Sequence, residues 1–382
     1  MKPVATFAVL AITLATAACG GHHDDATSGA PAGTPLSIDT AAQLRVGVVR
    51  GDTAQEFQRV VTPFLLPDGR LVVPAAGARA IRVFGPDGVL RETLGRPGEG
   101  PGEFGQLNAA WARGDTIEAF DGDLGRVTRF LPGGEPVVVP LDMVPSAQMG
   151  VPGVVAGGWI VTGVAGAGFG RRDSMVVHRF TRAGAHAVVI ASVEGMARYR
   201  TPTMSGPDPL SPRAVFALHG DAVYVAETLT PAIRVLAPDG ALERTVAWQP
   251  DAEPAPRAAF EEVVDAVAAQ AGPERAAGIR RQMASYPVRD RVPAFWDFMV
   301  DDDGFVWVQP FDAHATAIPL AGLRGAAPGG RWLILSPDGT RVGTVRMPDR
   351  FQPTQITADA VVGIRRNALG VEFVEVHALE RR

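Results

Sequence analysis

Residues 64–94 read FLLPDGRLVVPAAGARAIRVFGPDGVLRETL, and this stretch decides the fold. It contains four short apolar runs, with a Pro-Asp-Gly turn between the first and second runs and another between the third and fourth. Each Asp-Gly pair tolerates the left-handed backbone that a tight hairpin requires. The stretch therefore predicts an antiparallel sheet of four strands. The second run, Leu71-Val72-Val73, does not alternate apolar and polar residues, which is typical of a sheet packed on both faces.

The same four-part unit recurs along the chain, and in the complete copies a pair of Gly or Asp residues precedes the second run. Further copies span residues 109–141, 152–192, 214–248 and 295–347, and a sixth copy with only three strands follows Pro353. Such a repeat predicts an all-β fold, a six-bladed β-propeller that begins at residue 37 and ends at residue 382. A spare strand at residues 44–49 precedes the first copy. We expect it to complete the sixth blade and close the ring, which removes open sheet edges.

One segment breaks the repeat between the fourth and fifth copies. In residues 256–285, apolar residues recur at helical spacing, and Gly272-Pro273 ends one helix and starts another. We expect a helical hairpin inserted into the propeller. It either covers one rim of the ring or acts as a lid or a docking arm for a partner.

The amino terminus has the pattern of an export signal. Lys2 precedes an apolar run that ends in small residues before Cys19, and the run is shorter than the about 20 residues that a membrane-spanning helix needs. Residues 1–18 therefore predict a lipoprotein-type signal peptide, with Cys19 as the lipidated residue. The alternative is plain secretion with a free thiol. Residues 20–35 lack large apolar side chains, so we expect residues 19–36 to form a flexible tether.

Charge and composition exclude one class of partner. The chain has 36 basic and 41 acidic residues and a net charge of -5, without a block of like charge that could follow a phosphate backbone. We therefore expect no nucleic acid partner. His22 and His23 precede two aspartates in the tether, where they are either a metal-binding pair or part of a disordered leader.

Two segments resemble a known family. The connector LGRPGEGPGEF at residues 94–104 and the segment DDDGFVWV at residues 301–308 resemble parts of six-bladed propellers of the NHL-repeat type. The resemblance covers most of residues 44–379. It implies a central channel and a ligand-binding rim. It does not imply one activity, because propellers of this type include scaffolds, receptors, lyases and lactonases.

No active-site motif is present in the sequence. It lacks His-Glu-x-x-His, Gly-x-Ser-x-Gly and a phosphate loop ending in Gly-Lys. Propeller hydrolases hold calcium with Asn, Asp and Glu oxygens, but the sequence contains only two asparagines, Asn108 and Asn367. The triplet Asp301 to Asp303 before Gly304 is typical of a turn, with a metal site as the alternative. We expect no cofactor, no metal site and no catalytic residue, so an enzymatic activity is the weaker hypothesis.

Two connectors carry the side chains that dominate protein interfaces. Arginine and tyrosine contribute much of the binding energy at such surfaces, and these connectors either bind a ligand or merely cross between blades. The candidate ligand-binding residues are Arg96, Glu99, Glu103, Arg198, Tyr199 and Arg200. The sequence thus predicts an exported, lipid-anchored, non-catalytic propeller of the cell envelope that recognises a protein, peptide or glycan. The alternative is a metal-dependent hydrolase or lyase of the propeller lactonase type.

Overall fold

The structure, a computed structural model, describes residues 36–142, 149–166, 168–200, 205–208, 210–251, 255–284, 286, 288–313 and 329–381. The expected signal peptide, Cys19 and the pair His22 and His23 lie outside these residues. The described residues all lie within one compact unit, residues 33–382. Among the described residues, no helix combines the length and the apolar character needed to cross a bilayer.

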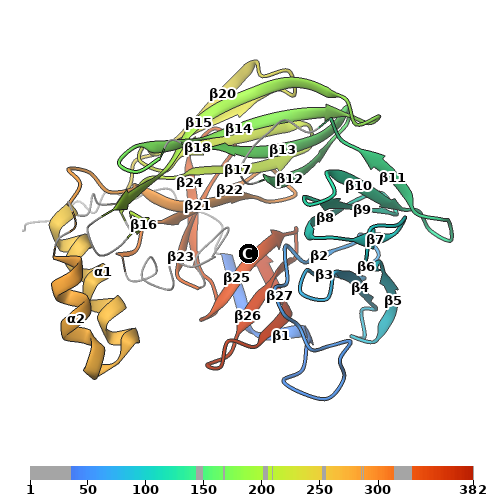
Figure 1. Cartoon of the computed structure of the whole chain (residues 1–382), viewed down its shortest axis with the longest axis horizontal. Helices are drawn as coiled ribbons and strands as arrows, with labels where there is room; N and C mark the ends of the chain where they lie inside the picture. The colour runs from blue at the N-terminus through green and yellow to red at the C-terminus, as the bar shows by residue number, and fades with distance from the viewer. Residues whose placement is uncertain are drawn as a thin grey trace, which may run out of the picture. The chain divides into compact units, whose positions relative to one another are not determined.

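The described residues form six antiparallel sheets, the blades of a β-propeller (Figure 1). The first three blades follow one another along the chain. Blade 1 contains β2 (Phe64–Leu65), β3 (Leu71–Ala75), β4 (Ala80–Phe84) and β5 (Leu90–Leu94). Blade 2 contains β8 (Leu107–Arg113), β9 (Thr116–Asp121), β10 (Arg126–Phe130) and β11 (Val137–Pro140). Blade 3 contains β12 (Met149–Val155), β13 (Gly158–Ala165), β14 (Arg172–Thr181), β15 (His186–Arg200) and β16 (Ser205–Pro207).

The other three blades complete the ring, and a short parallel pair, β6 (Arg96–Pro97) with β7 (Glu103–Phe104), joins the first two. Blade 4 contains β17 (Ala214–His219), β18 (Ala222–Glu227), β19 (Ala232–Leu236) and β20 (Leu242–Ala247). Blade 5 contains β21 (Phe295–Val300), β22 (Val306–Pro310), β23 (Arg331–Leu335) and β24 (Arg341–Arg346). Blade 6 contains β25 (Phe351–Ile356), β26 (Ala360–Arg366), β27 (Glu372–Arg381) and β1 (Leu36–Val46).

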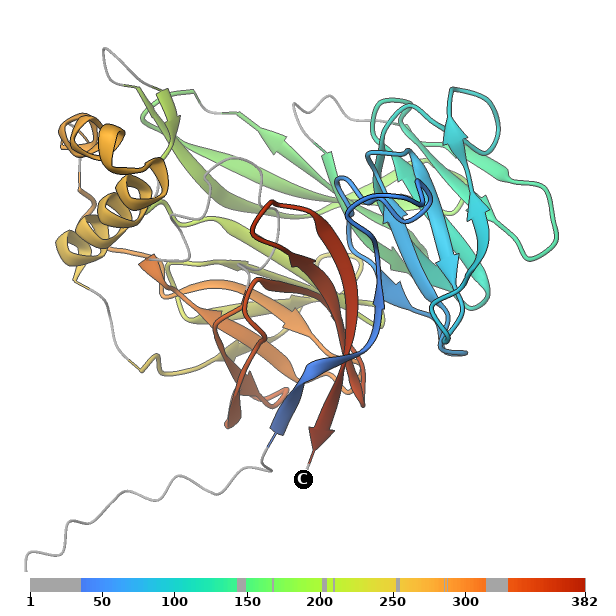
Figure 2. The same cartoon turned by 90° about the horizontal axis from the view of Figure 1, so that it is seen from below.

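Blades pack against both neighbours, as the lack of alternation in their strands predicts. Every residue of β3 and β4 is buried. Six apolar clusters each take residues from two consecutive blades, and one of them unites blade 6 with blade 1 through Val374, Val46 and Phe84. This pattern requires a closed ring, and Figure 2 shows the blades in that arrangement.

The amino-terminal strand closes the ring. β1 pairs antiparallel with β27, and Leu44, Arg45 and Val46 lie opposite Val376, Glu375 and Val374. Figure 2 shows the blue β1 beside the dark red β27. The pairing confirms that the first strand supplies the outer edge of the last blade. The strand spans Leu36–Val46 instead of the predicted residues 44–49, so it begins earlier and ends earlier than expected. Its first half was missed because half-buried and exposed positions alternate there without a marked apolar run.

Two helices form the insertion, α1 (Pro256–Ala271) and α2 (Pro273–Met283), within the segment for which the sequence predicts a helical hairpin. Gly272 has a φ of 82° and separates the helices. Phe260 and Met283 pack with Leu210, which precedes blade 4, and the hairpin lies at the edge of the ring in Figures 1 and 2. It therefore packs on the outside of the propeller.

Candidate functional site

The first feature is a cavity along the axis of the ring. It has a volume of about 670 Å³ and is lined by residues on or next to the innermost strands of five blades. We call it the channel cavity. In a blade of antiparallel strands, the first and third turns lie on one face of the ring, which we call the turn face. The second turn and the connectors between blades lie on the opposite face, which we call the connector face. The channel cavity reaches both faces, because Asp302 lies in a first turn and Arg366 and Glu372 flank a second turn.

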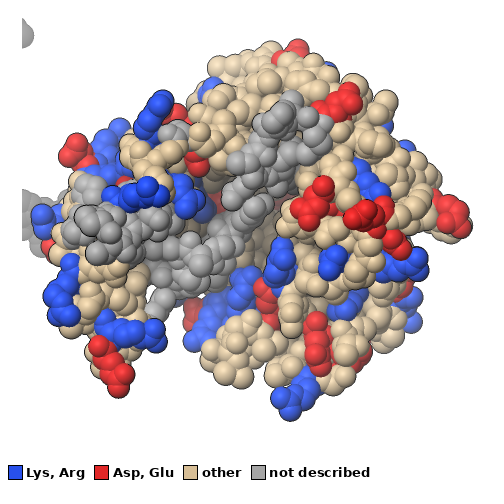
Figure 3. All heavy atoms as spheres, in the orientation of Figure 1, with Lys and Arg blue, Asp and Glu red and all other residues tan. Residues whose placement is uncertain are grey.

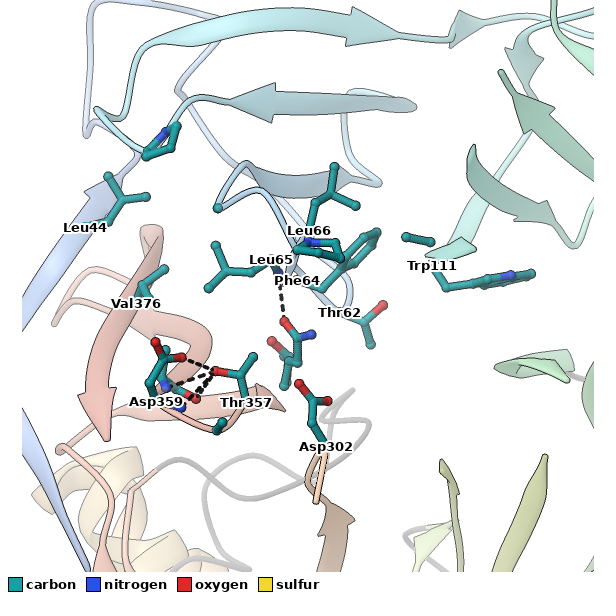
Figure 4. A pocket seen from close by; sticks show the side chains of 18 of the residues that line it. Leu44, Thr62, Phe64, Leu65, Leu66, Trp111, Asp302, Thr357, Asp359 and Val376 are labelled. Atoms are coloured by element: carbon teal, nitrogen blue, oxygen red, sulfur yellow. Dashed lines mark hydrogen bonds between the residues drawn. The ribbon is translucent and has the colours of Figure 1, made fainter. Parts of the chain in front are cut away.

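A second cavity of about 930 Å³ lies at the turn face (Figure 4). Apolar and aromatic side chains dominate its wall, among them Leu44, Phe64, Leu65 and Trp111. We call it the turn-face cavity. Both volumes lie in the range of about 300–1,000 Å³ that is typical of ligand pockets. A large concave site with an apolar wall and a few polar groups is the usual form of a binding site.

Four residues line both cavities: Thr62, Asp302, Thr354 and Gln355. The amide oxygen of Gln355 accepts a hydrogen bond from the backbone N–H of Leu65 at 2.7 Å, and this bond fixes Gln355 to blade 1. Thr62 has a φ of 36°, a left-handed conformation that a β-branched residue seldom adopts. Strain of this kind is often found at functional sites. The junction between the cavities is therefore polar and conformationally constrained.

Asp302 is the charged group at this junction. Arg381 pairs with both of its neighbours, Asp301 at 2.8 Å and Asp303 at 3.3 Å, whereas the carboxylate of Asp302 makes no ion pair or hydrogen bond within the described chain. Its carboxylate faces the cavity in Figure 4. Burial, followed by the charges of Asp301 and Asp303, raises the pKa of Asp302. The charges of His219 and Arg381 offset only part of this rise, and among the described residues neither forms an ion pair with the Asp302 carboxylate, so the junction favours a cationic ligand.

Other carboxylates of the channel cavity already have partners. Asp297 is buried and lies 3.6 Å from the guanidinium of Arg213, which stacks on the ring of Trp296. Burial raises the pKa of Asp297, and Arg213 offsets only part of that rise. Glu372 pairs with Arg366 at 2.7 Å. These pairs leave fewer free oxygen atoms for a metal ion. In the described segments, no group of three or more His, Cys, Asp and Glu is placed to hold one.

The triplet Asp301 to Asp303 forms the turn that the sequence predicts. The carboxylate of Asp301 accepts hydrogen bonds from the backbone N–H groups of Asp303 and Phe305 and from the indole N–H of Trp307 at 2.9 Å. Asp301 is thus a structural residue. The exposed position of Asp302 at the channel was not apparent from the sequence, because three adjacent carboxylates carry no sign of which one points inward.

The predicted binding residues of the first connector stabilise that connector. Arg96 pairs with Glu103 at 2.9 Å, and Glu103 also accepts the backbone N–H of Gly100. Arg126 of blade 2 donates to the carbonyl oxygens of Glu99, Gly100 and Glu103. The exposed side chain of Glu99 has no partner in the described chain. The connector is therefore a rigid loop, and none of Arg96, Glu99 and Glu103 lines either cavity.

The second predicted set, Arg198, Tyr199 and Arg200, lies at the end of β15. All three residues pair with β16, and the guanidinium of Arg200 lies 4.0 Å from the ring centre of Phe169. Figure 1 places β16 at the left edge of the ring and β6 and β7 at the right. The two predicted sets are therefore not brought together into one site.

Comparison with one solved structure supports the propeller fold. No family model and no curated protein matches the sequence. A member of the DUF4221 family from Bacteroides vulgatus has a similar structure, with a TM-score of 0.50, 8% identity, and coverage of 91% of this chain and 99% of that chain. A Bacteroides fragilis protein named as exported gives a TM-score of 0.47 at 9% identity and covers 91% and 95%. Virginiamycin B lyase from Staphylococcus aureus gives 0.41 at 10% identity and covers 90% and 99%.

Proposed function

We propose that the protein is a non-catalytic binding module of the cell envelope that holds a segment of peptide or protein in the turn-face cavity. One observation carries the proposal: the carboxylate of Asp302 makes no ion pair or hydrogen bond within the described residues, and it lies at the inner end of a cavity with an apolar wall. A peptide that inserts an apolar side chain against Phe64 and Leu65 and a basic side chain toward Asp302 complements both features.

The rest of the cavity supports the same class of ligand. Trp111 is half-buried on the wall, and aromatic side chains are enriched at the centres of protein interfaces. Thr357 and Asp359 lie at the rim, where Thr357 donates to the Asp359 carboxylate at 3.0 Å (Figure 4). The rim is thus polar and the wall apolar, as in a typical recognition surface.

Export and anchoring complete the proposal. The apolar run before Cys19 and the small residues next to it favour a lipid-anchored protein, and residues 20–35 are long enough to separate the propeller from a membrane. The segments 94–104 and 301–308 favour a relationship to NHL-type propellers. Figure 3 shows basic and acidic side chains interspersed on the face in view, which does not favour a polyanionic partner.

A site-specific crosslinking experiment in the native envelope tests the proposal. A photoreactive amino acid replaces the exposed Gln43, which lines the turn-face cavity, and captured partners are identified by mass spectrometry. The control position is Leu242, an exposed apolar residue on the outer strand of blade 4. We expect Gln43 to capture a defined peptide or protein and Leu242 to capture none.

Two matched variants show whether capture depends on the charge at the junction. Asp302→Asn removes the channel carboxylate, and Asp115→Asn removes an exposed carboxylate from a turn on the same face. We expect Asp302→Asn to lower crosslinking at least fivefold and Asp115→Asn to leave it unchanged. Equal capture from Gln43 and Leu242, or capture that Asp302→Asn does not alter, would reject a peptide site in this cavity.

A metal-dependent hydrolase or lyase is the outcome that would replace the proposal. A catalytic ion that binds only the folded protein raises its melting temperature. We expect calcium and zinc to leave the melting temperature unchanged, because Asp297 and Glu372 already pair with Arg213 and Arg366. A rise that Asp297→Asn abolishes would place a cation in the channel and favour the enzyme.

A further inference from the structure

A third cavity lies at the connector face between blades 1 and 2. It has a volume of about 340 Å³, and its polar lining residues are Arg59, Arg79, Gln106 and Asp123. We call it the connector cavity. Arg59 and Gln106 also line the channel cavity, so the two spaces adjoin. The connector cavity lies at the opposite end of the channel from the turn-face cavity, and its function does not depend on the proposal above.

Within the described residues, no carboxylate forms an ion pair with either arginine of this cavity. Neither guanidinium makes an ion pair or a hydrogen bond within the part of the chain that the structure describes, and both residues are exposed. Most guanidinium groups at the other sites described above are paired, such as Arg366 with Glu372 and Arg381 with Asp301. Two free guanidinium groups on one small cavity create a positive potential that attracts an anion.

The backbone also singles out these two residues. Arg59 has a φ of 53° and Arg79 a φ of 52°, which is a left-handed conformation that is unfavourable for a long side chain. The carbonyl oxygen of Arg59 accepts the N–H of Ala76, and that of Gln58 accepts the N–H of Gly77. A side chain at Gly77 would lie 2.4 Å from the Gln58 oxygen, so the glycine permits this close approach. The fold therefore holds both arginines in strained positions, as often happens at binding sites.

The opposite wall of the cavity is fixed by a buried carboxylate. Asp121 accepts hydrogen bonds from the backbone N–H groups of Gly105 and Gln106 on the connector and from Asp123 and Leu124 in the turn of blade 2. The side chain of Asp121 is fully buried. The cavity is thus rigid on both sides, and a rigid frame is what a small ligand needs for specific binding.

From this arrangement we infer that the connector cavity binds a hydroxylated carboxylic acid of the sugar-acid type. The two guanidinium groups are suited to one carboxylate, which each can hold through paired N–H donors. Asp123 and the amide of Gln106 accept hydrogen bonds from hydroxyl groups. The negative charge of Asp123 disfavours a dianion such as phosphate. The wall has no aromatic or large apolar side chain, so it does not suit the side chains of a peptide.

Titration of the full chain with D-glucuronate, followed by saturation-transfer NMR and calorimetry, tests the inference. D-glucose is the probe without a carboxylate, and N-acetyl-Ala-Ala is the probe with a carboxylate but without hydroxyl groups. We expect glucuronate to bind at least about tenfold more tightly than either, since a charge-assisted hydrogen bond contributes that much or more. Equal binding of glucose would reject the role of the arginines, and equal binding of the dipeptide would reject a sugar acid.

Substitutions locate the binding. Arg59→Gln and Arg79→Gln each remove one charge, and Arg350→Gln is the control, because Arg350 is also exposed and left-handed, with a φ of 59°, but lines none of these cavities. We expect each of the first two variants to weaken glucuronate binding about tenfold and the control to leave it unchanged. Arg79 lies on a separate turn from Arg59, so one variant remains informative if the other is poorly folded. No binding to the wild type, or equal loss in Arg350→Gln, would overturn the inference.

Discussion

The indole N–H of Trp159 in blade 3 donates a hydrogen bond of 2.7 Å to the carboxylate of Glu118 in blade 2. Glu118 is fully buried, and it also accepts bonds from Trp111 and from the guanidinium of Arg182, which stacks on Trp159. Asp301 makes a similar arrangement with Trp307 and Arg381 between blades 5 and 6. Buried carboxylates with several donors thus tie neighbouring blades together at two places.

We predict that Glu118→Gln destabilises the propeller by about 3 kcal/mol or more, because removing one member of a buried ion pair leaves the other unpaired. Chemical denaturation of the purified chain measures the loss. Glu92→Gln, on the exposed strand β5, is the control and should change stability by less than about 0.5 kcal/mol. Equal stability of the two variants would show that the Trp159 bond and the Arg182 pair contribute little.

The same pair predicts a pH dependence. Burial would raise the pKa of Glu118, but the hydrogen bonds from Arg182 and Trp159 outweigh burial and hold the pKa below its usual value. The stabilisation is therefore present above the unfolded pKa of about 4.3 and is lost as the pH falls through the folded pKa. We expect the stability difference between wild type and Glu118→Gln to be largest near pH 7 and to shrink in acid. A difference that grows in acid would contradict this sign.

A chain that begins at Gly47 should lose stability as a whole. It lacks β1, so β27 loses its partner and the cluster of Val46, Val374 and Phe84 between blades 6 and 1 is opened. Relative to a chain that begins at Gly33, we expect one cooperative melting transition at a lower temperature, and a peptide of residues 36–46 should raise it again by adding the missing strand. An unchanged melting curve would mean that β1 does not close the ring.

The repeat and its closure could be predicted from the sequence because turns and strands are local. The pair Asp68-Gly69 identifies a hairpin, and the observed φ of 83° at Gly69 is the left-handed value that the turn requires. Trp159 and Trp307 lie inside apolar runs and are fully buried, as expected for blade packing.

The cavities could not be predicted in the same way. The cavities are lined by residues from a connector and from turns, among them Arg59, Arg79 and Asp302, and only the closed ring brings these segments together around the channel. The left-handed backbone of Arg59 and Arg79 also has no signature in the sequence. Arg96 and Glu103 of the first connector line neither the turn-face cavity nor the channel cavity, since their charges pair with each other within the loop, and their role in ligand binding stays a prediction.

Replacement of Cys19 by Ser tests the anchor. Cys19 follows an apolar run and three small residues, and we expect an acyl chain on its thiol to hold the protein in the membrane fraction. The Cys19→Ser variant should move to the detergent-free soluble fraction and lack the added mass of the lipid. Ser28→Ala, in the same predicted tether, is the control and should remain with the membrane. Membrane partition of Cys19→Ser would exclude lipidation at this residue.

Asp302→Asn should stabilise the propeller slightly at neutral pH. Burial and the charges of Asp301 and Asp303 raise the pKa of Asp302, so the folded state disfavours its charge. The protonated Asp302 side chain contributes to the stability of the folded state below its pKa in the unfolded chain, about 3.9. This contribution is lost as the pH rises through the pKa of Asp302 in the folded protein. Because the side chain is exposed to the channel, we expect a gain of less than about 1 kcal/mol at pH 7 and none at pH 3. Denaturation of Asp302→Asn and wild type at both pH values measures it. A loss of stability at pH 7 would show that a cationic group pairs with Asp302 in the folded protein. The Asp302 carboxylate would then not be available to the basic side chain of the proposed ligand.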